Sequence, residues 1–177
     1  MTVGDYLAPF KNEAFSLYTS VPTSINSDSE ANMARNAKIK FLNFIEKINV
    51  ELGKLNDDMG KCGDLSSSVG SIDTSSVSSN IVNAQSLIKN NFNFGDFYPG
   101  ESSSKTAASS MNNFIDSLSS LKNAITTAKN DIETAITEMK NLAKVAESYI
   151  KKIDIALVNW EREKARRALE RAKKNNK

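Results

Sequence analysis

Residues 111–160 read MNNFIDSLSSLKNAITTAKNDIETAITEMKNLAKVAESYIKKIDIALVNW, and this stretch decides the fold that the sequence predicts. Its apolar residues recur at alternating steps of three and four positions, an average of about 3.5 residues per turn, which keeps one apolar line facing a partner helix. The residues of this line are Met111, Phe114, Leu118, Leu121, Ile125, Ala128, Ile132, Ala135, Met139, Leu142, Ala146, Tyr149, Ile153, Ala156 and Trp160. The pattern therefore predicts one long helix that packs against other helices in a coiled coil.

The predicted helix contains nothing that would force it to break, because the segment from Glu101 to Lys177 holds neither glycine nor proline. We expect it to extend over about residues 102–172. A second apolar line widens the apolar face of its C-terminal half, and its residues are Ile136, Ala143, Ile150 and Leu157. A wider face indicates contact with more than one neighbouring helix, so this half should be more deeply surrounded than the half before it.

Shorter helices are predicted before the long one. Residues 1–26 should form an N-terminal amphipathic helix and loop, with Pro9 in the first helical turn, where its missing N–H group does no harm. Residues 27–177 should form a helical bundle built around the long helix. The predicted fold is therefore all-α: an elongated helical bundle or coiled coil of three to four helices with a long C-terminal helix.

The second of these helices has a clear start signal in the sequence. Ser27 and Glu30 have the spacing of a capping box, in which two free backbone N–H groups at a helix start are satisfied reciprocally. The glycines within residues 60–63 should end this helix, because glycine readily adopts the left-handed conformation of a helix cap. A polar linker over residues 64–74 should then lead into a shorter helix over residues 74–90.

The composition excludes several kinds of site. The chain has no histidine and a single cysteine, Cys62, so Ser-His and Cys-His nucleophile pairs, His-ligated zinc and an internal disulfide are excluded. The adjacent acids Asp57 and Asp58 lie in a polar context typical of a solvated helix surface. We therefore expect no enzymatic activity, no cofactor, no metal and no small-molecule substrate.

Two further patterns bear on the location of the protein. No stretch approaches the roughly 18 consecutive apolar residues of a membrane span. The N-terminus begins without the basic and apolar runs of a signal peptide. We therefore expect a protein without a membrane span that is cytoplasmic, or that is exported without a cleaved signal peptide.

The C-terminal end is strongly basic. Residues 161–177 carry a net charge of +5, which leaves −3 for the other 160 residues. The basic tail comprises Arg162, Lys164, Arg166, Arg167, Arg171, Lys173 and Lys174. Acid-first pairs four residues apart, such as Glu163 with Arg167, favour a helix-stabilising role. Contact with an acidic protein surface or with anionic lipid is the alternative, while nucleic acid is an unlikely partner because no aromatic residues are interleaved for stacking.

Two segments are predicted to bind a partner. The first is the aromatic turn over residues 91–100, which is either a hydrophobic plug between helices or a protruding loop, since aromatic residues concentrate binding energy at interfaces. The second is the broad apolar face within residues 140–160, which should remain available to another chain. The predicted partner-binding residues are Phe92, Phe94, Phe97, Tyr98, Tyr149, Ile150, Ile153, Leu157 and Trp160.

Residues 74–150 contain a pattern found in one group of exported proteins. A helix with Val77, Ile81, Ala84 and Ile88 is followed by the turn FGDFYPG at residues 94–100 and by a helix start rich in small residues at 102–110. This arrangement resembles the WXG-type hairpin of small helical proteins of type VII secretion and of related LXG-domain targeting partners. The chain has no Trp-x-Gly or Leu-x-Gly turn, and Tyr149 is followed four positions later by Ile153 rather than by an acid.

The predicted function is that of a non-enzymatic bacterial protein that acts by association with another helical protein. The resemblance implies a leaderless type VII secretion substrate, or an adaptor or chaperone that pairs with a toxin's helical targeting domain. Alternatives are a structural subunit of a phage or cell-envelope assembly and a nucleic-acid-binding accessory protein. Alanines among the larger residues of the long helix favour a hetero-oligomer, because a symmetric two-stranded dimer more often carries Leu or a β-branched residue throughout.

Overall fold

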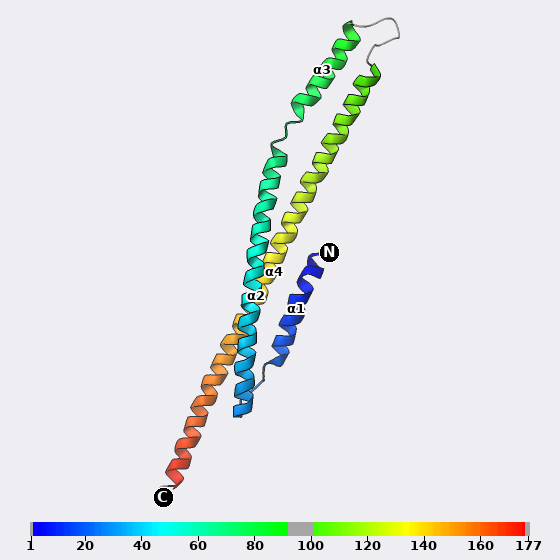
Figure 1. Cartoon of the computed structure of the whole chain (residues 1–177). Coiled ribbons are helices and arrows are strands. Elements are labelled where there is room, and N and C mark those ends of the chain that lie inside the picture. The colour runs from blue at the N-terminus through cyan, green and yellow to red at the C-terminus, as the bar shows by residue number, and fades with distance from the viewer. Residues whose placement is uncertain (1, 92–100, 176–177) are drawn as a thin grey trace. The chain divides into compact units, whose positions relative to one another are not determined.

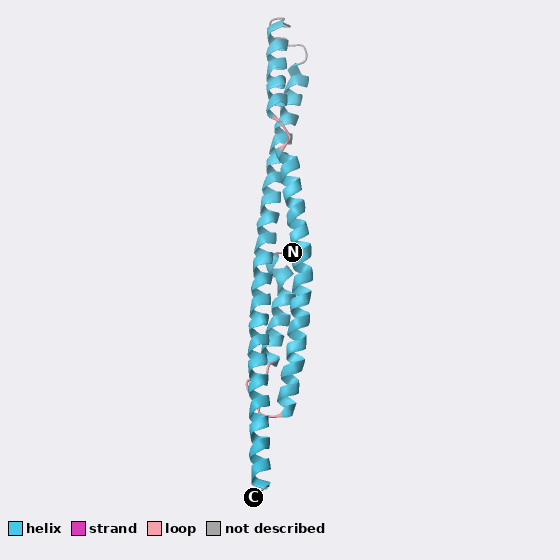
Figure 2. Ribbon diagram, turned by 90° about the vertical axis from the view of Figure 1, so that its left-hand side faces the viewer, coloured by secondary structure: helices cyan, strands magenta, loops and turns pink. Residues whose placement is uncertain are grey.

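The structure is a computed structural model, and it describes residues 2–91 and 101–175. Four α-helices follow one another in this part of the chain: α1 (Val3–Ser20), α2 (Asp28–Gly70), α3 (Ser75–Asn91) and α4 (Glu101–Asn175). Helices and short connecting loops account for all of the described residues (Figure 2). The predictions of an all-α fold and of a long C-terminal helix are confirmed.

Contacts along the chain define two units. Residues 1–57 and 131–177 form the first, which we call the three-helix unit, and residues 58–130 form the second, the hairpin unit. In the three-helix unit, α1 lies beside the first part of α2 and the last part of α4 (Figure 1). In the hairpin unit, the end of α2 and α3 lie beside the first part of α4.

The core of the three-helix unit is centred on three aromatic rings, one from each helix. Tyr18 of α1 stacks on Tyr149 of α4 with ring centroids 4.7 Å apart, and Phe41 of α2 stacks on Tyr149 at 5.5 Å. Alanines, larger aliphatic residues and Phe44 extend this core; the buried ones are Leu7, Ala14, Leu17, Ala31, Ala34, Ala37, Phe44, Ile48, Leu55, Ala135, Ile136, Met139, Ala146 and Ile153. The small alanines let the helices approach closely around the rings.

Charged and polar side chains connect the three helices at the surface of this unit. On α1, the Tyr6 hydroxyl donates a hydrogen bond to Glu51 of α2 at 2.7 Å, and Lys11 pairs with Glu138 of α4 at 2.9 Å. The ion pairs between α2 and α4 are Arg35–Glu161 at 2.7 Å, Lys38–Asp154 at 2.6 Å and Asp28–Lys164 at 2.6 Å. Exposed pairs of this kind contribute only about 0–1 kcal/mol each, so their main effect is to fix the register of helices that apolar burial holds together.

The start of α1 differs from the prediction. Thr2 and Asp5 form a capping box, in which the Asp5 N–H group donates to Thr2 Oγ1 at 3.2 Å and the Thr2 N–H group donates to Asp5 Oδ2 at 2.8 Å. Because this cap starts the helix at Val3, Pro9 is its seventh residue and lies in the helix interior. The prediction that Pro9 occupies the first turn was therefore wrong. Proline has no N–H group, so Pro9 cannot donate a hydrogen bond to the carbonyl group of Asp5. Both residues are exposed, so water can bind this carbonyl group instead.

The predicted cap at the start of α2 is only half formed. The Glu30 N–H group donates to Ser27 Oγ at 3.2 Å, as a capping box requires. The Glu30 carboxylate, however, accepts a hydrogen bond from the N–H group of Asn26 at 2.6 Å, one residue before the expected donor. The helix start itself lies where it was predicted.

The predicted end of α2 was wrong. The helix continues through the glycines at positions 60 and 63 and ends at Gly70, so the predicted linker over residues 64–74 shrinks to residues 71–74. A glycine inside a helix costs only about 1 kcal/mol relative to alanine. Val69 is buried together with Leu118 and Ile125 of α4, and this packing stabilises the helical turns of α2 that follow the two glycines. Asp73 then accepts hydrogen bonds from the Ser75 N–H and hydroxyl groups at 2.9 and 2.6 Å and caps α3.

Candidate helix-docking surfaces

The apolar residues of α4 form two parallel lines, each with a spacing of seven positions. The Phe114 line consists of Phe114, Leu121, Ala128, Ala135, Leu142, Tyr149 and Ala156. The Leu118 line consists of Met111, Leu118, Ile125, Ile132, Met139, Ala146, Ile153 and Trp160. The two lines lie side by side on one helix, so the neighbouring helices can cover either one of them or both.

In the three-helix unit both lines are covered. On the Leu118 line, Met139 and Ala146 are 0% exposed. On the Phe114 line, Ala135 is buried and Tyr149 stacks against the rings of both Tyr18 and Phe41, which also stack on each other. Helix α2 covers α4 through residues such as Phe41, and α1 covers it through residues such as Tyr18.

Among the described residues of the hairpin unit, only one line is covered. Leu118 and Ile125 are buried, whereas Phe114 and Leu121 are 47% and 48% exposed and Ala128 is exposed as well. Further large apolar side chains of the hairpin unit are also exposed, namely Leu65, Ile72, Val77 and Val82. The expectation that the first half of the long helix is less deeply surrounded is thus confirmed. The Phe114 line of the hairpin unit, meaning Phe114, Leu121 and Ala128, is an apolar surface without a covering helix among the described residues.

The broad face predicted to receive a partner within residues 140–160 requires a correction. Ile153 is 2% exposed and Tyr149 belongs to the aromatic stack, so both are core residues of the three-helix unit. Ile150, Leu157 and Trp160 are half-buried. The chain covers part of this face with α1, whose Tyr18 stacks on Tyr149. The apolar residues Leu7, Ala14 and Leu17 predicted an amphipathic helix that packs on the bundle, but their spacing did not indicate which part of α4 it covers.

The aromatic turn cannot be placed. Its four predicted partner-binding residues, Phe92, Phe94, Phe97 and Tyr98, lie outside the described residues. The choice between a plug and a protruding loop therefore stays a prediction.

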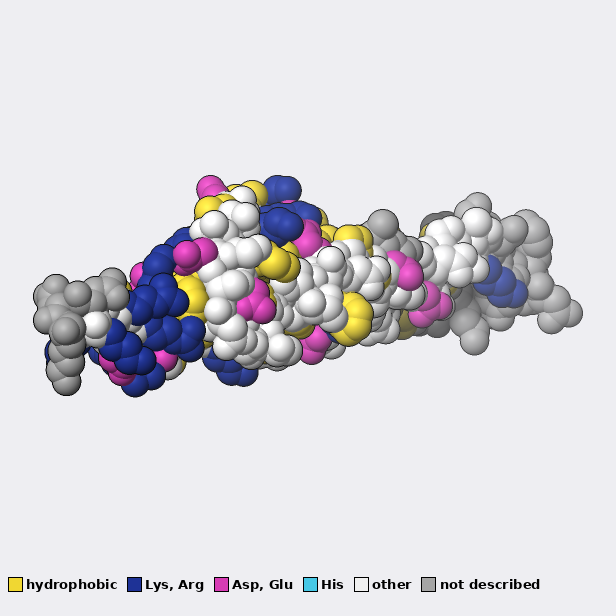
Figure 3. Space-filling model, turned by 90° about the horizontal axis from the view of Figure 1, so that it is seen from below, with side chains coloured by type: hydrophobic (Ala, Val, Ile, Leu, Met, Phe, Trp, Pro, Cys, Tyr) yellow, Lys and Arg dark blue, Asp and Glu magenta, His cyan; other side chains and the backbone are white. Residues whose placement is uncertain are grey.

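The predicted basic tail lies on the last turns of α4. Its seven predicted residues are all exposed, and Figure 3 shows Lys and Arg side chains gathered toward this end of the helix. Glu163 accepts hydrogen bonds from Arg166 at 2.8 Å and from Arg167 at 2.9 Å, and these guanidinium groups lower the pKa of Glu163 from 4.5 to about 2. The predicted pair of Glu163 and Arg167 is therefore present, and part of the basic charge is balanced along the helix itself.

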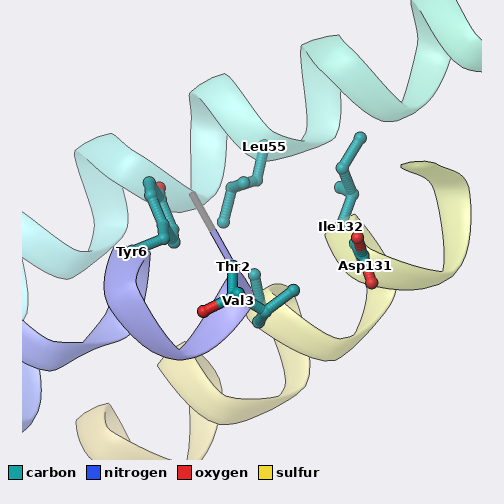
Figure 4. A pocket seen from close by; sticks show the side chains of 7 residues that line it. Thr2, Val3, Tyr6, Leu55, Asp131 and Ile132 are labelled. Carbon is teal, nitrogen blue, oxygen red and sulfur yellow. The ribbon is translucent and has the colours of Figure 1, made fainter. Parts of the chain in front are cut away.

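Two shallow cavities lie within the three-helix unit. One of about 220 Å³ opens at the start of α1, and Figure 4 shows Tyr6, Leu55 and Ile132 among the side chains that line it. The other, of about 260 Å³, lies between residues 24–26 and α4 beside Trp160. The first is lined mainly by apolar groups. Within residues 2–91 and 101–175, no group of three or more cysteines and acids could hold a metal ion.

None of the described helices has an apolar stretch long enough to cross a lipid bilayer. Comparisons with protein-family models, curated proteins and solved structures found no match to the chain.

Proposed function

We propose that this chain is a non-enzymatic interaction protein that binds a helix of another protein on the Phe114 line of its hairpin unit. One observation carries the proposal. The same line of α4 is covered by a third helix in the three-helix unit, where Tyr149 meets Tyr18, and is open in the hairpin unit, where Phe114 and Leu121 are about half exposed.

Apolar burial supplies the driving force for this association. Burying a Leu or Phe side chain completely contributes about 1.5–3 kcal/mol, and half of that gain is still available at each half-exposed position. The size of the side chains falls along the line from Phe114 through Leu121 to Ala128. A partner helix can therefore approach most closely at Ala128, and this graded surface favours a different protein over a symmetric pairing of identical helices.

The cellular setting that we propose is type VII secretion, with the chain as a leaderless substrate or as an adaptor that pairs with a toxin's helical targeting domain. Support comes from the paired helices of the hairpin unit, which flank the glycine-containing aromatic segment of residues 91–100. An exposed helical hairpin that needs a third helix is the kind of surface that an adaptor would offer.

Site-specific photocrosslinking in bacterial cells that produce the chain and its partner would test the proposal. A benzophenone amino acid replaces Leu121 in one variant and Asn123 in the matched control, since both residues are exposed on the same turn of α4 but only Leu121 belongs to the Phe114 line. We expect a discrete crosslinked protein with Leu121 and none with Asn123. The double substitution Phe114→Ser with Leu121→Ser should abolish co-purification of that protein and leave the helical circular dichroism spectrum unchanged.

Two results would contradict the proposal. One is equal crosslinking at both positions, which would indicate random collisions. The other is a monomer by light scattering that gives no crosslink at Leu121 and binds no hydrophobic dye. That outcome would mean that the chain covers the Phe114 line with its own residues.

A further inference from the structure

A second apolar stripe lies on the opposite side of α4 from the core. Ile155, Val158, Arg162, Ala165, Leu169 and Ala172 follow one another at alternating steps of three and four positions. All six are exposed, and the fractions for Ile155, Val158 and Leu169 are 63%, 49% and 64%. We call these six residues the outer stripe. Large, exposed apolar side chains within a series of alternating three- and four-residue steps are the pattern of a coiled-coil contact.

The acidic residues beside the outer stripe form ion pairs with α2, whereas two of the basic residues in or beside the stripe do not. Asp154 and Glu161, the acids on one side of it, are each engaged by α2, through Lys38 at 2.6 Å and Arg35 at 2.7 Å. By contrast, Arg162 within the stripe and Lys173 beside it form no ion pair with another described residue. The stripe therefore presents apolar groups with uncompensated positive charge.

We propose that the outer stripe is a docking surface for an acidic amphipathic helix of another protein, one with an apolar seam flanked by Asp or Glu. Opposite charges across a helix pair select the partner, and the apolar seam supplies the affinity. The proposal goes beyond the Phe114 line because it assigns a separate surface in the other unit.

Charge decides among the possible occupants. A second copy of the chain would bring two segments of net charge +5 together, which like-charge repulsion opposes. An anionic membrane would be a poor match, because the apolar side of the stripe has no aromatic residue and is interrupted by Arg162. Phosphate contacts of a nucleic acid would leave Ile155, Val158 and Leu169 without a role.

The test uses the full chain and two synthetic peptides of about 28 residues, four heptads each. Both carry Leu at the two seam positions, and the flanking positions hold Glu in one peptide and Lys in the other. Fluorescence anisotropy should show saturable binding of the acidic peptide that weakens as the salt concentration rises from about 50 to about 150 mM, and no binding of the basic peptide. Vesicles that contain phosphatidylserine and a short DNA duplex serve as the remaining probes.

Paired variants separate the two parts of the surface. Val158→Ser with Leu169→Ser removes apolar area, and Arg162→Glu with Lys173→Glu reverses charge; each pair should weaken binding about tenfold or more, the effect of losing about 1.4 kcal/mol. All four residues are exposed, so thermal unfolding should be unchanged. Lys40→Glu with Lys122→Glu, also exposed, is the charge-matched control and should bind normally. Leu121→Ser should bind normally too, which keeps this result separate from the test of the Phe114 line.

The proposal is overturned if the acidic peptide does not bind, or if it binds equally well to the chain with Arg162→Glu and Lys173→Glu. It is also overturned if Leu121→Ser weakens the binding, because the peptide would then sit on the hairpin unit. Tighter binding of the vesicles or of the duplex than of the acidic peptide at about 150 mM salt would instead assign the stripe to a membrane or to nucleic acid.

Discussion

Tyr149 of α4 stacks on Tyr18 of α1 with ring centroids 4.7 Å apart and ring planes inclined by 13°. This contact is where the third helix of the three-helix unit meets the Phe114 line. Aromatic pairs contribute about 0.5–1.5 kcal/mol beyond the area that they bury, so α1 is held by more than its aliphatic residues. For the partner helix that we propose on the hairpin unit, we expect a large, flat side chain to pack on Phe114 in the same way.

Replacement of a core residue of α4 should destabilise the protein far more than replacement on the open line. Ile153 is 2% exposed and Leu121 is 48% exposed. We expect Ile153→Ala to lower the free energy of unfolding by about 2–5 kcal/mol, because it removes buried methyl groups and leaves a cavity. Ile132→Ala, at a half-buried position, should have a smaller effect, and Leu121→Ala should cost about 0.5 kcal/mol or less. Thermal melts followed by circular dichroism measure all three, and equal melting temperatures for Ile153→Ala and Leu121→Ala would refute the assigned core.

Burial of Tyr18 should make the protein sensitive to alkaline pH. Loss of solvent, with Tyr149 beside it, raises the pKa of Tyr18 above its ordinary value of 10.0, and its hydroxyl group is buried without a hydrogen-bond partner among the described residues. The unfolded chain therefore releases this proton at a lower pH than the folded chain. The stability that neutral Tyr18 provides is complete below pH 10.0 and is lost as the pH rises through the raised pKa.

The variant Tyr18→Phe tests this. At about pH 7 it should be as stable as the parent or more stable by about 1 kcal/mol, because an unpaired buried hydroxyl group is removed. Above pH 10.0, the free energy of unfolding should fall less steeply for Tyr18→Phe than for the parent. Urea denaturation at several pH values gives both curves, and lysine deprotonation is a background common to them. Parallel curves would show that Tyr18 ionises normally.

The sequence predicts the long helix well because its signal is local and repeated. Fifteen apolar residues from Met111 to Trp160 follow one another at alternating steps of three and four positions, and no glycine or proline interrupts them. The end of α2 could not be predicted in the same way. Residues 60–63 contain two glycines and look like a helix end, but Val69 packs on α4 and keeps the chain helical to Gly70. That contact joins positions far apart in the sequence, and no local propensity reports it.

The docking surfaces were predictable only in part. The polar neighbours of Phe114 and Leu121 indicated a narrow apolar face, and the structure shows that this face is covered on one side only. The broad face around Ile153 was misplaced as a partner site because spacing indicates how wide an apolar face is and not which helices cover it. The N-terminal helix α1 supplies one of them, through Tyr18.

Neutralisation of Glu163 should loosen the last turns of α4. Glu163 accepts hydrogen bonds from Arg166 and Arg167, and these contacts hold its pKa at about 2, so they are fully present above pH 4.5 and are lost as the pH falls through about 2. We expect Glu163→Gln to speed amide hydrogen exchange in peptides from residues 164–174 and to leave the rest of the chain unaffected. Glu170→Gln, which removes a single contact with Arg166, should have a smaller effect in the same peptides. Equal exchange in the parent and in Glu163→Gln would indicate that α4 needs no side-chain support there.

Replacement of Pro9 should stabilise the protein. Pro9 lies in the interior of α1, where proline cannot donate to the carbonyl group of Asp5 four residues earlier and crowds that group with its ring. In Pro9→Ala the new N–H group can complete the helix, and the Pro9 side chain is exposed, so no packing is lost. We expect the free energy of unfolding to rise by about 1–3 kcal/mol, measured by urea denaturation. Pro22→Ala is the matched control, because Pro22 lies outside the helices, and it should leave stability unchanged or lower it by about 0.4–1 kcal/mol through the more flexible unfolded chain. A loss of stability in Pro9→Ala would mean that the fixed backbone of proline is what holds α1 against Tyr149.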